Sequence, residues 1–428
     1  MSRLLTSAVL VLLAALPRPA LAQTEPRVCT TVTKNLYVRD ALFRYYLWYQ
    51  FLPDVDPARY ASPEAYLEAV RYRELDSRYS YVTDRAASEA FFSDSQFIGF
   101  GFSTQTIDLE MRVLQVFDDS PAAEAGLARG DRLLEVNGRS VAELIASGQI
   151  GGVFGPSEEG VRRSVVVETR EGERRELEMV KRIVTIPTVS LTRVFEVDGR
   201  TVGYIFFRNF VRPSFDALDE AFAALREAGV TELVLDLRYN GGGLVDVAVH
   251  LGSLIGGSVN EGRVFAEYRH NDRNTHLDKA LRFTRPEAAL NLERLVVIAS
   301  GASASASELV VNALRPYMPV TLIGDTTYGK PVGQYGLAFC DKVVAPVSFV
   351  LVNADGDADY FEGLRADCPA PDDLDHDLGD SREGSLAEAL TFIRTGACTA
   401  PPASEPQRLR ATERPRRETG WQSVVNAH

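Results

Sequence analysis

The chain has 428 residues, of which 45% are hydrophobic and 25% are charged, so it is long enough for two or three globular domains with sizeable cores. Its formal net charge is −13 at pH 7, and this acidic balance argues against nucleic acid as a partner. Beyond the first 22 residues, no segment is long and apolar enough to be a stable membrane span.

The first 22 residues have the pattern of a secretory signal peptide. Arg3 supplies the positive end, residues 4–16 form the apolar stretch, and residues 20–22 (Ala-Leu-Ala) form a small-residue cleavage site. The apolar stretch is too short to cross a bilayer, and two prolines follow it closely. We therefore expect a protein that is periplasmic or secreted.

An even number of cysteines in an oxidising compartment suggests two disulfides, and their spacing fits no zinc site. The four are Cys29, Cys340, Cys368 and Cys398. Of the three possible pairings we expect Cys340 with Cys368, because they bracket one hairpin-like stretch. Cys29 would then join Cys398 and tie the ends of the mature chain together.

Residues 23–94 are predicted to form a helical N-terminal segment. Apolar and aromatic residues recur at helical spacing over residues 36–52, and Ser62 followed by Pro63 is a typical helix start. The aromatic side chains are most simply explained as core packing.

Residues 95–182 change to alternating strand patterns separated by turn pairs such as Asn137-Gly138. A short helix is predicted within "SPAAEAGL". Together these features predict a compact, mostly-β module with one or two helices.

Residues 183–398 have an α/β pattern. An amphipathic helix over residues 214–229 precedes the apolar strand "ELVLDLR", and a second apolar strand, "RLVVIAS", comes later. Continuous apolar strands are typical of a sheet covered on both faces. Residues 399–428 are rich in proline and arginine and are predicted to be a disordered tail.

The stretch "GASASASELVV" allows two interpretations of Ser305. Ser305 and Glu308 fit a capping box, in which the serine only satisfies the free amides of a helix start. A serine at a strand-to-helix turn can also be a nucleophile, with the following amide placed to bind an oxyanion. Such a serine needs a base, and the five histidines stand in no informative context.

Lys330, in "GDTTYGKPVGQ", is the alternative base, because burial can keep a lysine neutral. It is either that base or a solvated loop lysine, and Gln334 could hold its amine. The glycines of "DLRYNGGGL" follow a predicted buried strand. No nucleotide P-loop is present, and backbone amides in such a turn suit an oxyanion donor.

These three motifs, in this order and spacing, resemble the carboxyl-terminal processing (tail-specific) protease family. The resemblance implies Ser305 as the nucleophile, Lys330 as the general base, Gln334 as its assistant, and the amides of Gly243 and Ala306 as oxyanion donors. It also implies an α/β catalytic core of the ClpP/crotonase-like type. One departure is Pro331, where many members have glycine.

The mostly-β module resembles a PDZ domain inserted before this core. "SPAAEAGLARGDRLLEVNG" is its most recognisable stretch, and the loop Gly99, Phe100, Gly101 and Phe102 resembles a carboxylate-binding loop. Amides of such a loop can capture a chain-terminal carboxylate while the peptide adds as a strand. We expect protein or peptide substrates with exposed C-termini, and tail binding that gates the active site.

A PDZ-type scaffold without catalysis and an esterase are the alternative functions. The acidic stretch "DGDAD" lacks the glycine and the final glutamate of a calcium loop, and "DDLDHDLGDS" is most simply a solvated loop, so no metal and no cofactor are predicted. The sequence leaves open the natural substrate, the cleavage-site preference, the oligomeric state and whether an adaptor protein activates the enzyme.

Overall fold

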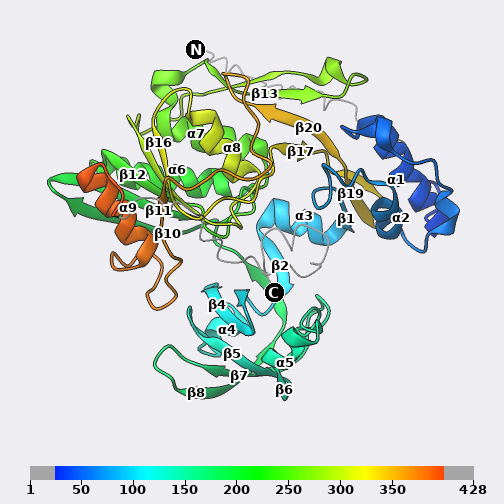
Figure 1. Cartoon of the computed structure of the whole chain (residues 1–428), viewed down its shortest axis with the longest axis horizontal. Coiled ribbons are helices and arrows are strands. Elements are labelled where there is room, and N and C mark those ends of the chain that lie inside the picture. The colour runs from blue at the N-terminus through cyan, green and yellow to red at the C-terminus, as the bar shows by residue number, and fades with distance from the viewer. Residues whose placement is uncertain (1–24, 400–428) are drawn as a thin grey trace, which may run out of the picture.

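The computed structural model describes residues 25–399, so the signal-peptide prediction and nearly all of the predicted tail lie outside the described residues. Figure 1 shows three regions: a helical segment at the right, an α/β core at the upper left, and a β module below them. The expected mixed α/β architecture is confirmed. Among the described residues, no helix has both the length and the apolar character needed to cross a membrane.

The helical N-terminal segment packs against the core and extends one of its sheets. Ser62 accepts a hydrogen bond from the amide of Ala65, with Pro63 at the first helical position, as predicted. The ring of Tyr37 stacks on that of Phe339 at 4.5 Å, so the aromatic side chains do form a core. The elements are α1 (Thr31–Tyr45), η1 (Tyr49–Phe51), η2 (Pro57–Arg59), α2 (Pro63–Val70), β1 (Tyr81–Asp84) and α3 (Arg85–Asp94).

The β module has its own hydrophobic core, in which Phe154 packs on Phe100 and Phe102. Its strand order is β3-β4-β5-β7-β8, which leaves β3 at an edge of the sheet. Its elements are β3 (Phe102–Ile107), β4 (Glu110–Val116), α4 (Pro121–Glu124), β5 (Arg132–Val136), β6 (Arg139–Ser140), α5 (Val141–Ala146), β7 (Arg162–Glu168) and β8 (Arg174–Val180).

The chain enters and leaves the β module through two strands that pair with each other. These are β2 (Gln96–Gly99) and β9 (Arg182–Thr185), which run antiparallel with Phe97 opposite Val184. Figure 1 shows this short ribbon between the module and the rest of the chain.

The main sheet of the core carries helices on both faces. α6, α7 and α8 pack on one face and α9 packs on the other, which explains why β12 and β15 are apolar throughout. Strands β11, β12, β15, β16 and β21 run parallel, and β10 is antiparallel. The strands are β10 (Val189–Val197), β11 (Arg200–Phe207), β12 (Glu232–Asp236), β15 (Leu295–Ala299), β16 (Val320–Gly324) and β21 (Cys368–Pro369). The helices are α6 (Ser214–Glu227), α7 (Val245–Asn260), α8 (Ala306–Leu314) and α9 (Gly384–Thr395).

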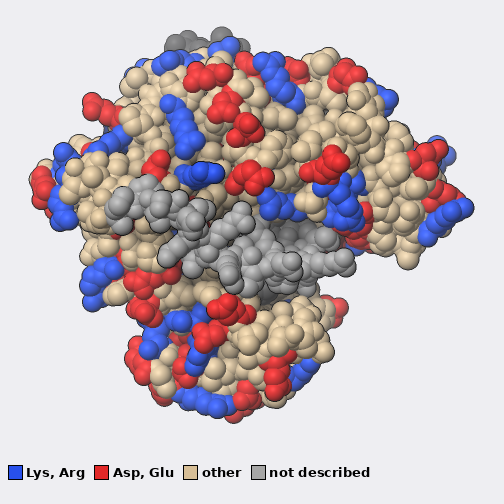
Figure 2. All heavy atoms as spheres, viewed as in Figure 1, with Lys and Arg blue, Asp and Glu red and all other residues tan. Residues whose placement is uncertain are grey.

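Smaller sheets complete the core on the side of the N-terminal segment. One has the order β14-β13-β20-β17, and the other has the order β1-β19-β18, so it takes a strand from the N-terminal segment. Their elements are β13 (Val264–His270), η3 (Thr275–Leu277), β14 (Ala280–Arg282), β17 (Val332–Gln334), β18 (Leu337–Phe339), β19 (Lys342–Ala345) and β20 (Val347–Val352). On the face in Figure 2, acidic and basic side chains are interspersed over the core and the β module.

The predicted disulfide pairing is wrong. Cys29 is bonded to Cys340, and Cys368 is bonded to Cys398. Cys340 lies at the turn between β18 and β19, in the sheet that β1 joins, which brings it to the start of α1. Cys368 lies on β21 beside β16, and α9 packs against β16, which brings Cys398 to it. Pairing followed contacts between elements rather than nearness along the sequence.

Candidate active site

Ser305 lies at the turn that joins β15 to α8 and has an unusual backbone conformation, with φ of 57° and ψ of −112°. Residues other than glycine rarely hold such angles unless the surroundings impose them, and they gather at functional sites. The hydroxyls of Ser303 and Ser307 donate to the carbonyls of Leu237 and Asn240, each at 2.9 Å. The Ser305 side chain belongs to a capping box with Glu308, and among the described residues its hydroxyl, unlike those of Ser303 and Ser307, donates to no carbonyl.

The glycine loop after β12 packs directly against Ser305. A Cβ at Gly242 would lie 2.7 Å from the amide nitrogen of Ala306 and 2.8 Å from the Cβ of Ser305, so only glycine fits. Gly243 has φ of 143° and pairs with Phe210 in an isolated parallel β-bridge. The amides of Gly243 and Ala306 find no acceptor within residues 25–399. Two unused amides beside the Ser305 hydroxyl can bind the oxygen of a tetrahedral intermediate.

Lys330 is buried just before β17, and its Nζ donates to Oε1 of Gln334 at 2.7 Å. Burial lowers the pKa of Lys330 to about 8, although the carboxylates of Asp76 and Glu308 act in the opposite direction. A lysine with such a pKa is partly neutral near physiological pH and can accept a proton. The solvated-loop interpretation of Lys330 therefore does not describe this structure.

Glu308 connects the serine turn to the lysine loop. Its carboxylate accepts hydrogen bonds from the amides of Ser305 (2.9 Å), Gly329 (2.7 Å) and Lys330 (2.8 Å), and from the Thr327 hydroxyl. Burial raises the pKa of Glu308, while these hydrogen bonds oppose the rise. The bond to the Ser305 amide is the one that the capping pattern predicts, whereas the bonds to the lysine loop had no signal in the sequence.

Ser305 and Lys330 are brought to one site, but no hydrogen bond joins their side chains in the described part of the chain. Catalytic hydrogen bonds are often long without a substrate and tighten when one binds. In this structure the amine of Lys330 is held by Gln334 rather than by Ser305.

The N-terminal segment supplies part of the site, which sequence reasoning missed. The Gln334 side-chain amide donates to the carbonyl of Tyr79, and the Tyr79 hydroxyl donates to the carbonyl of Gly329. Gln334 is therefore held by a backbone carbonyl of the N-terminal segment. Every residue has such a carbonyl, so the sequence could not predict this contact.

Asp76 is the fully buried carboxylate that orders this turn. It accepts hydrogen bonds from the Tyr46 hydroxyl (2.9 Å) and from the amides of Tyr79 (3.0 Å) and Ser80 (2.9 Å). Its negative charge is one of the two that favour the protonated form of Lys330. Asp76 therefore affects both the geometry and the charge of the lysine environment.

The loop Gly99–Phe102 lies in the β module, at the start of edge strand β3. Phe100 and Phe102 are buried, and Gly101 has φ of 91°, with Ser120 so close that a Cβ would overlap it. The two phenylalanines thus build the module core, while only the backbone of the loop and the free edge of β3 remain for a peptide.

One group of potential metal ligands lies close together among the described residues: Cys368, Glu388 and Cys398. The two sulfurs are joined in a disulfide, so they offer no thiolate to a metal.

Three stretches of the chain match known protein families. Residues 201–358 match peptidase family S41, residues 34–81 match the S41 N-terminal domain, and residues 112–149 match a PDZ domain. Residues 201–358 are therefore a peptidase family S41 domain, preceded by the N-terminal domain typical of that family. The β module is a PDZ domain.

Two curated relatives are similar to this chain in sequence. It is 25% identical over 297 residues to the carboxy-terminal processing protease CtpA of Bacillus subtilis. The aligned region covers 68% of this chain and 60% of the relative. It is 27% identical over 277 residues to a carboxy-terminal-processing protease of Bartonella bacilliformis. Here the aligned region covers 61% of this chain and 60% of the relative. The chain thus aligns with less than two thirds of the length of either relative.

Solved structures show the same fold as this chain. An S41 protease structure from Bacteroides fragilis, described as putative, superposes with a TM-score of 0.69 at 24% identity, covering 87% of this chain and 98% of that one. The photosystem II D1 C-terminal processing protease superposes with a TM-score of 0.51 at 22% identity, covering 80% and 94%.

Proposed function

We propose that the chain is an exported serine endopeptidase that cleaves proteins recognised through their C-terminal tails. Residues 183–398 would form the catalytic core, residues 95–182 the PDZ domain, and residues 23–94 the helical segment. The observation that carries the proposal is the buried Lys330, with a pKa of about 8, held by Gln334. Glu308 ties its loop to the turn of Ser305. Two disulfides agree with an oxidising compartment and therefore with export.

In the first half of the reaction, neutral Lys330 takes the proton of the Ser305 hydroxyl as Oγ attacks the scissile carbonyl carbon. The carbonyl oxygen becomes an oxyanion, which the amides of Gly243 and Ala306 stabilise. Protonated Lys330 then gives its proton to the departing amine, and the C–N bond breaks. An acyl group remains on Ser305, and the peptide C-terminal to the cut leaves.

In the second half, a water molecule attacks the acyl carbon while Lys330 accepts its proton, and the same amides hold the second oxyanion. Collapse of this intermediate returns the proton to Ser305 and releases the new C-terminus. Gln334 is a positioning residue here, because it contacts the amine of Lys330 rather than the substrate.

Tail recognition is assigned to the free edge of β3 and the loop that precedes it. An added strand would pair with the backbone of β3, and its terminal carboxylate would meet the amides of Gly99–Phe102. A test is binding of a peptide with a free C-terminus and of the same peptide with an amidated C-terminus. Equal affinity of the two peptides would exclude carboxylate recognition.

Because Ser305 and Lys330 share no hydrogen bond in this structure, we also propose that tail binding moves the PDZ domain and completes their alignment. Deleting the domain should then change both the rate and the preference for tails. A folded deletion variant that kept the wild-type rate and preference would exclude gating.

The catalytic assignment is tested with Ser305→Ala and Lys330→Ala on a loosely folded protein with an apolar C-terminus. Both variants should lose cleavage, whereas Lys279→Ala, which removes an exposed lysine, should keep the wild-type rate. Gln334→Ala should cause a smaller loss. Unchanged cleavage in both Ser305→Ala and Lys330→Ala would reject the assignment. A wild-type chain that binds tails but never reacts with a serine-directed fluorophosphonate would instead support the non-catalytic scaffold.

A further inference from the structure

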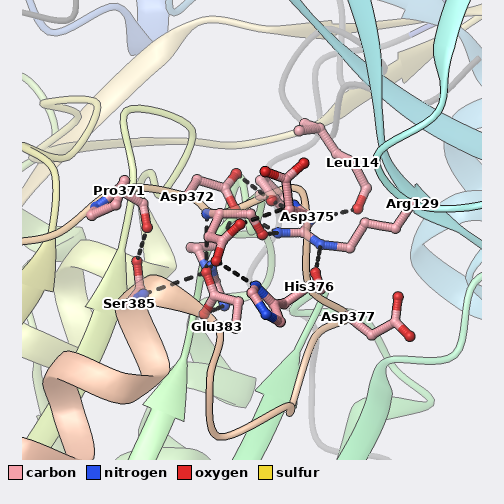
Figure 3. A network of polar contacts seen from close by, with 12 residues as sticks. Leu114, Arg129, Pro371, Asp372, Asp375, His376, Asp377, Glu383 and Ser385 are labelled. Atoms are coloured by element: carbon pink, nitrogen blue, oxygen red, sulfur yellow. Dashed lines mark hydrogen bonds and ion pairs between the residues drawn. The ribbon is translucent and has the colours of Figure 1, made fainter. Parts of the chain in front are cut away.

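A network of polar contacts joins the PDZ domain to the segment before α9 (Figure 3), and it continues to the residues that follow β12. Arg129, which follows α4, donates to the carbonyl of Leu114 in its own domain at 2.7 Å. Its other partners belong to the core: the Tyr239 hydroxyl at 2.8 Å, the Asp372 carboxylate at 2.7 Å and the carbonyl of His376 at 3.1 Å. One side chain of the PDZ domain therefore contacts two separate segments of the core.

Asp372 is the carboxylate at which these segments meet. It accepts from Arg129, from Arg238 at 3.1 Å and from the Tyr239 hydroxyl. Arg238 is also paired with two fully buried carboxylates, those of Asp236 and Glu383. Burial would raise the pKa of Asp372, but the guanidinium groups of Arg238 and Arg129 hold it below the ordinary value. Asp372 is thus ionised at neutral pH and binds both of its donors.

Tyr239 is held at both ends in a conformation that a bulky residue rarely adopts. Its φ is 62°, its hydroxyl lies between Arg129 and Asp372, and its carbonyl accepts a hydrogen bond from Arg208. Arg208 in turn donates to Gln115 of the PDZ domain at 3.1 Å. Without these contacts, little would keep Tyr239 in the left-handed region.

Tyr239 leads directly into the glycine loop, which is also held by hydrogen bonds from Asn240 to Phe207 and from Phe210 to Gly242. The side-chain oxygen of the next residue, Asn240, accepts a hydrogen bond from the Gly242 amide at 2.9 Å. The backbone carbonyl of Asn240 accepts one from the Ser307 hydroxyl, also at 2.9 Å. Gly242 then packs against Ser305, and Gly243 presents the unused amide. A rotation at Tyr239 would therefore displace the Gly243 amide relative to Ser305.

We propose that Arg129, Tyr239 and Asp372 are positioning residues that hold the Gly243 amide in place for the oxyanion. This inference rests on the proposed function. It assigns a role to Asp372, which lies outside the residues that match the family, and to Arg129, which belongs to the PDZ domain. The oxyanion site would then be assembled from the core, the PDZ domain and the segment before α9.

The test compares Tyr239→Phe and Asp372→Asn with the wild-type chain. Tyr239→Phe removes only the hydroxyl, and Asp372→Asn removes only the charge. Asp375→Asn and Asp377→Asn are matched controls on the same loop, since these side chains are 82% and 70% exposed. Three quantities are measured: the rate at which a fluorophosphonate labels Ser305, the affinity of a peptide aldehyde, and the affinity of a tail peptide for the PDZ domain.

Both test variants should label at least about tenfold more slowly, because loss of a whole oxyanion donor typically costs about 100- to 1,000-fold. Their affinity for the aldehyde, whose adduct places an oxyanion in the same site, should fall in proportion. Tail affinity and both controls should stay within about twofold of the wild type, as expected for changes that do not touch an energetically important group.

Wild-type or faster labelling by folded Tyr239→Phe would overturn the inference. Slower labelling with unchanged aldehyde affinity would overturn it as well, because the defect would then lie outside the oxyanion site. If Asp372→Asn does not fold, Arg129→Lys provides the second variant, since it keeps the charge but loses the forked contacts. Labelling that persists in Ser305→Ala would instead contradict the proposed function.

Discussion

The rate of Ser305 acylation should rise with pH and level off above the pKa of Lys330. Only the neutral amine can accept the serine proton, so the rate follows the neutral fraction. With a pKa of about 8, that fraction is about 10% at pH 7 and about 90% at pH 9, a rise of roughly tenfold. An ordinary lysine with a pKa of 10.4 would give a rise of about 100-fold over the same span, with no plateau.

The assay is the second-order rate constant for fluorophosphonate labelling, measured from pH 6 to pH 10 at constant ionic strength. A midpoint near pH 6.5 would indicate a histidine base instead. A tenfold increase per pH unit through pH 10 would show that Lys330 is not desolvated in solution. Either result would refute the assignment of a buried lysine as the base. Lys330→Arg is the control, because arginine cannot lose its proton in this range and should show no such profile.

Four further predictions concern the same region and its cross-links. Asp76→Asn should move the midpoint of the labelling profile to lower pH, because a charge that favours protonated Lys330 is lost. Lys330→Met should abolish cleavage yet stabilise the fold by about 3 kcal/mol at pH 7 in urea titrations, since burying a lysine whose pKa falls from 10.5 to about 8 is costly. Gly242→Ala should lower the labelling rate by about 100-fold, because its Cβ would overlap the Ala306 amide. Removing the Cys368–Cys398 disulfide, which spans 30 residues, should cost about 4 kcal/mol in the same titration.

The sequence revealed the elements of the site because their signals are local. Continuous apolar strands predicted β12 and β15, and a serine with a glutamate three residues later predicted the start of α8. Lys330 and Gln334 are four residues apart around a short strand, so they meet without distant contacts. Patterns of this kind depend on near neighbours, which a sequence displays directly.

The remaining features depend on contacts between distant elements. Cys340 meets Cys29 only because α1 packs on the hairpin β18–β19. The carbonyl of Tyr79 reaches Gln334 across 255 residues, and a carbonyl is present at every position, so nothing in the sequence distinguishes this one. Asp372 belongs to an acidic stretch that the sequence predicted to be a solvated loop, yet its carboxylate pairs with the buried side chains of Arg129 and Arg238.

The ribbon formed by β2 and β9 brings the two ends of the PDZ domain side by side. Gly99 lies opposite Arg182 at the end of the paired strands, so the chain departs and returns at neighbouring positions. A two-residue Asn-Gly turn joining these positions would close the ribbon as an ordinary hairpin. The same point could accept a different binding domain in place of the present one. An exchange of this kind would leave the strands of the core unbroken, but the new domain would have to replace the contacts that Arg129 and Gln115 make with the core.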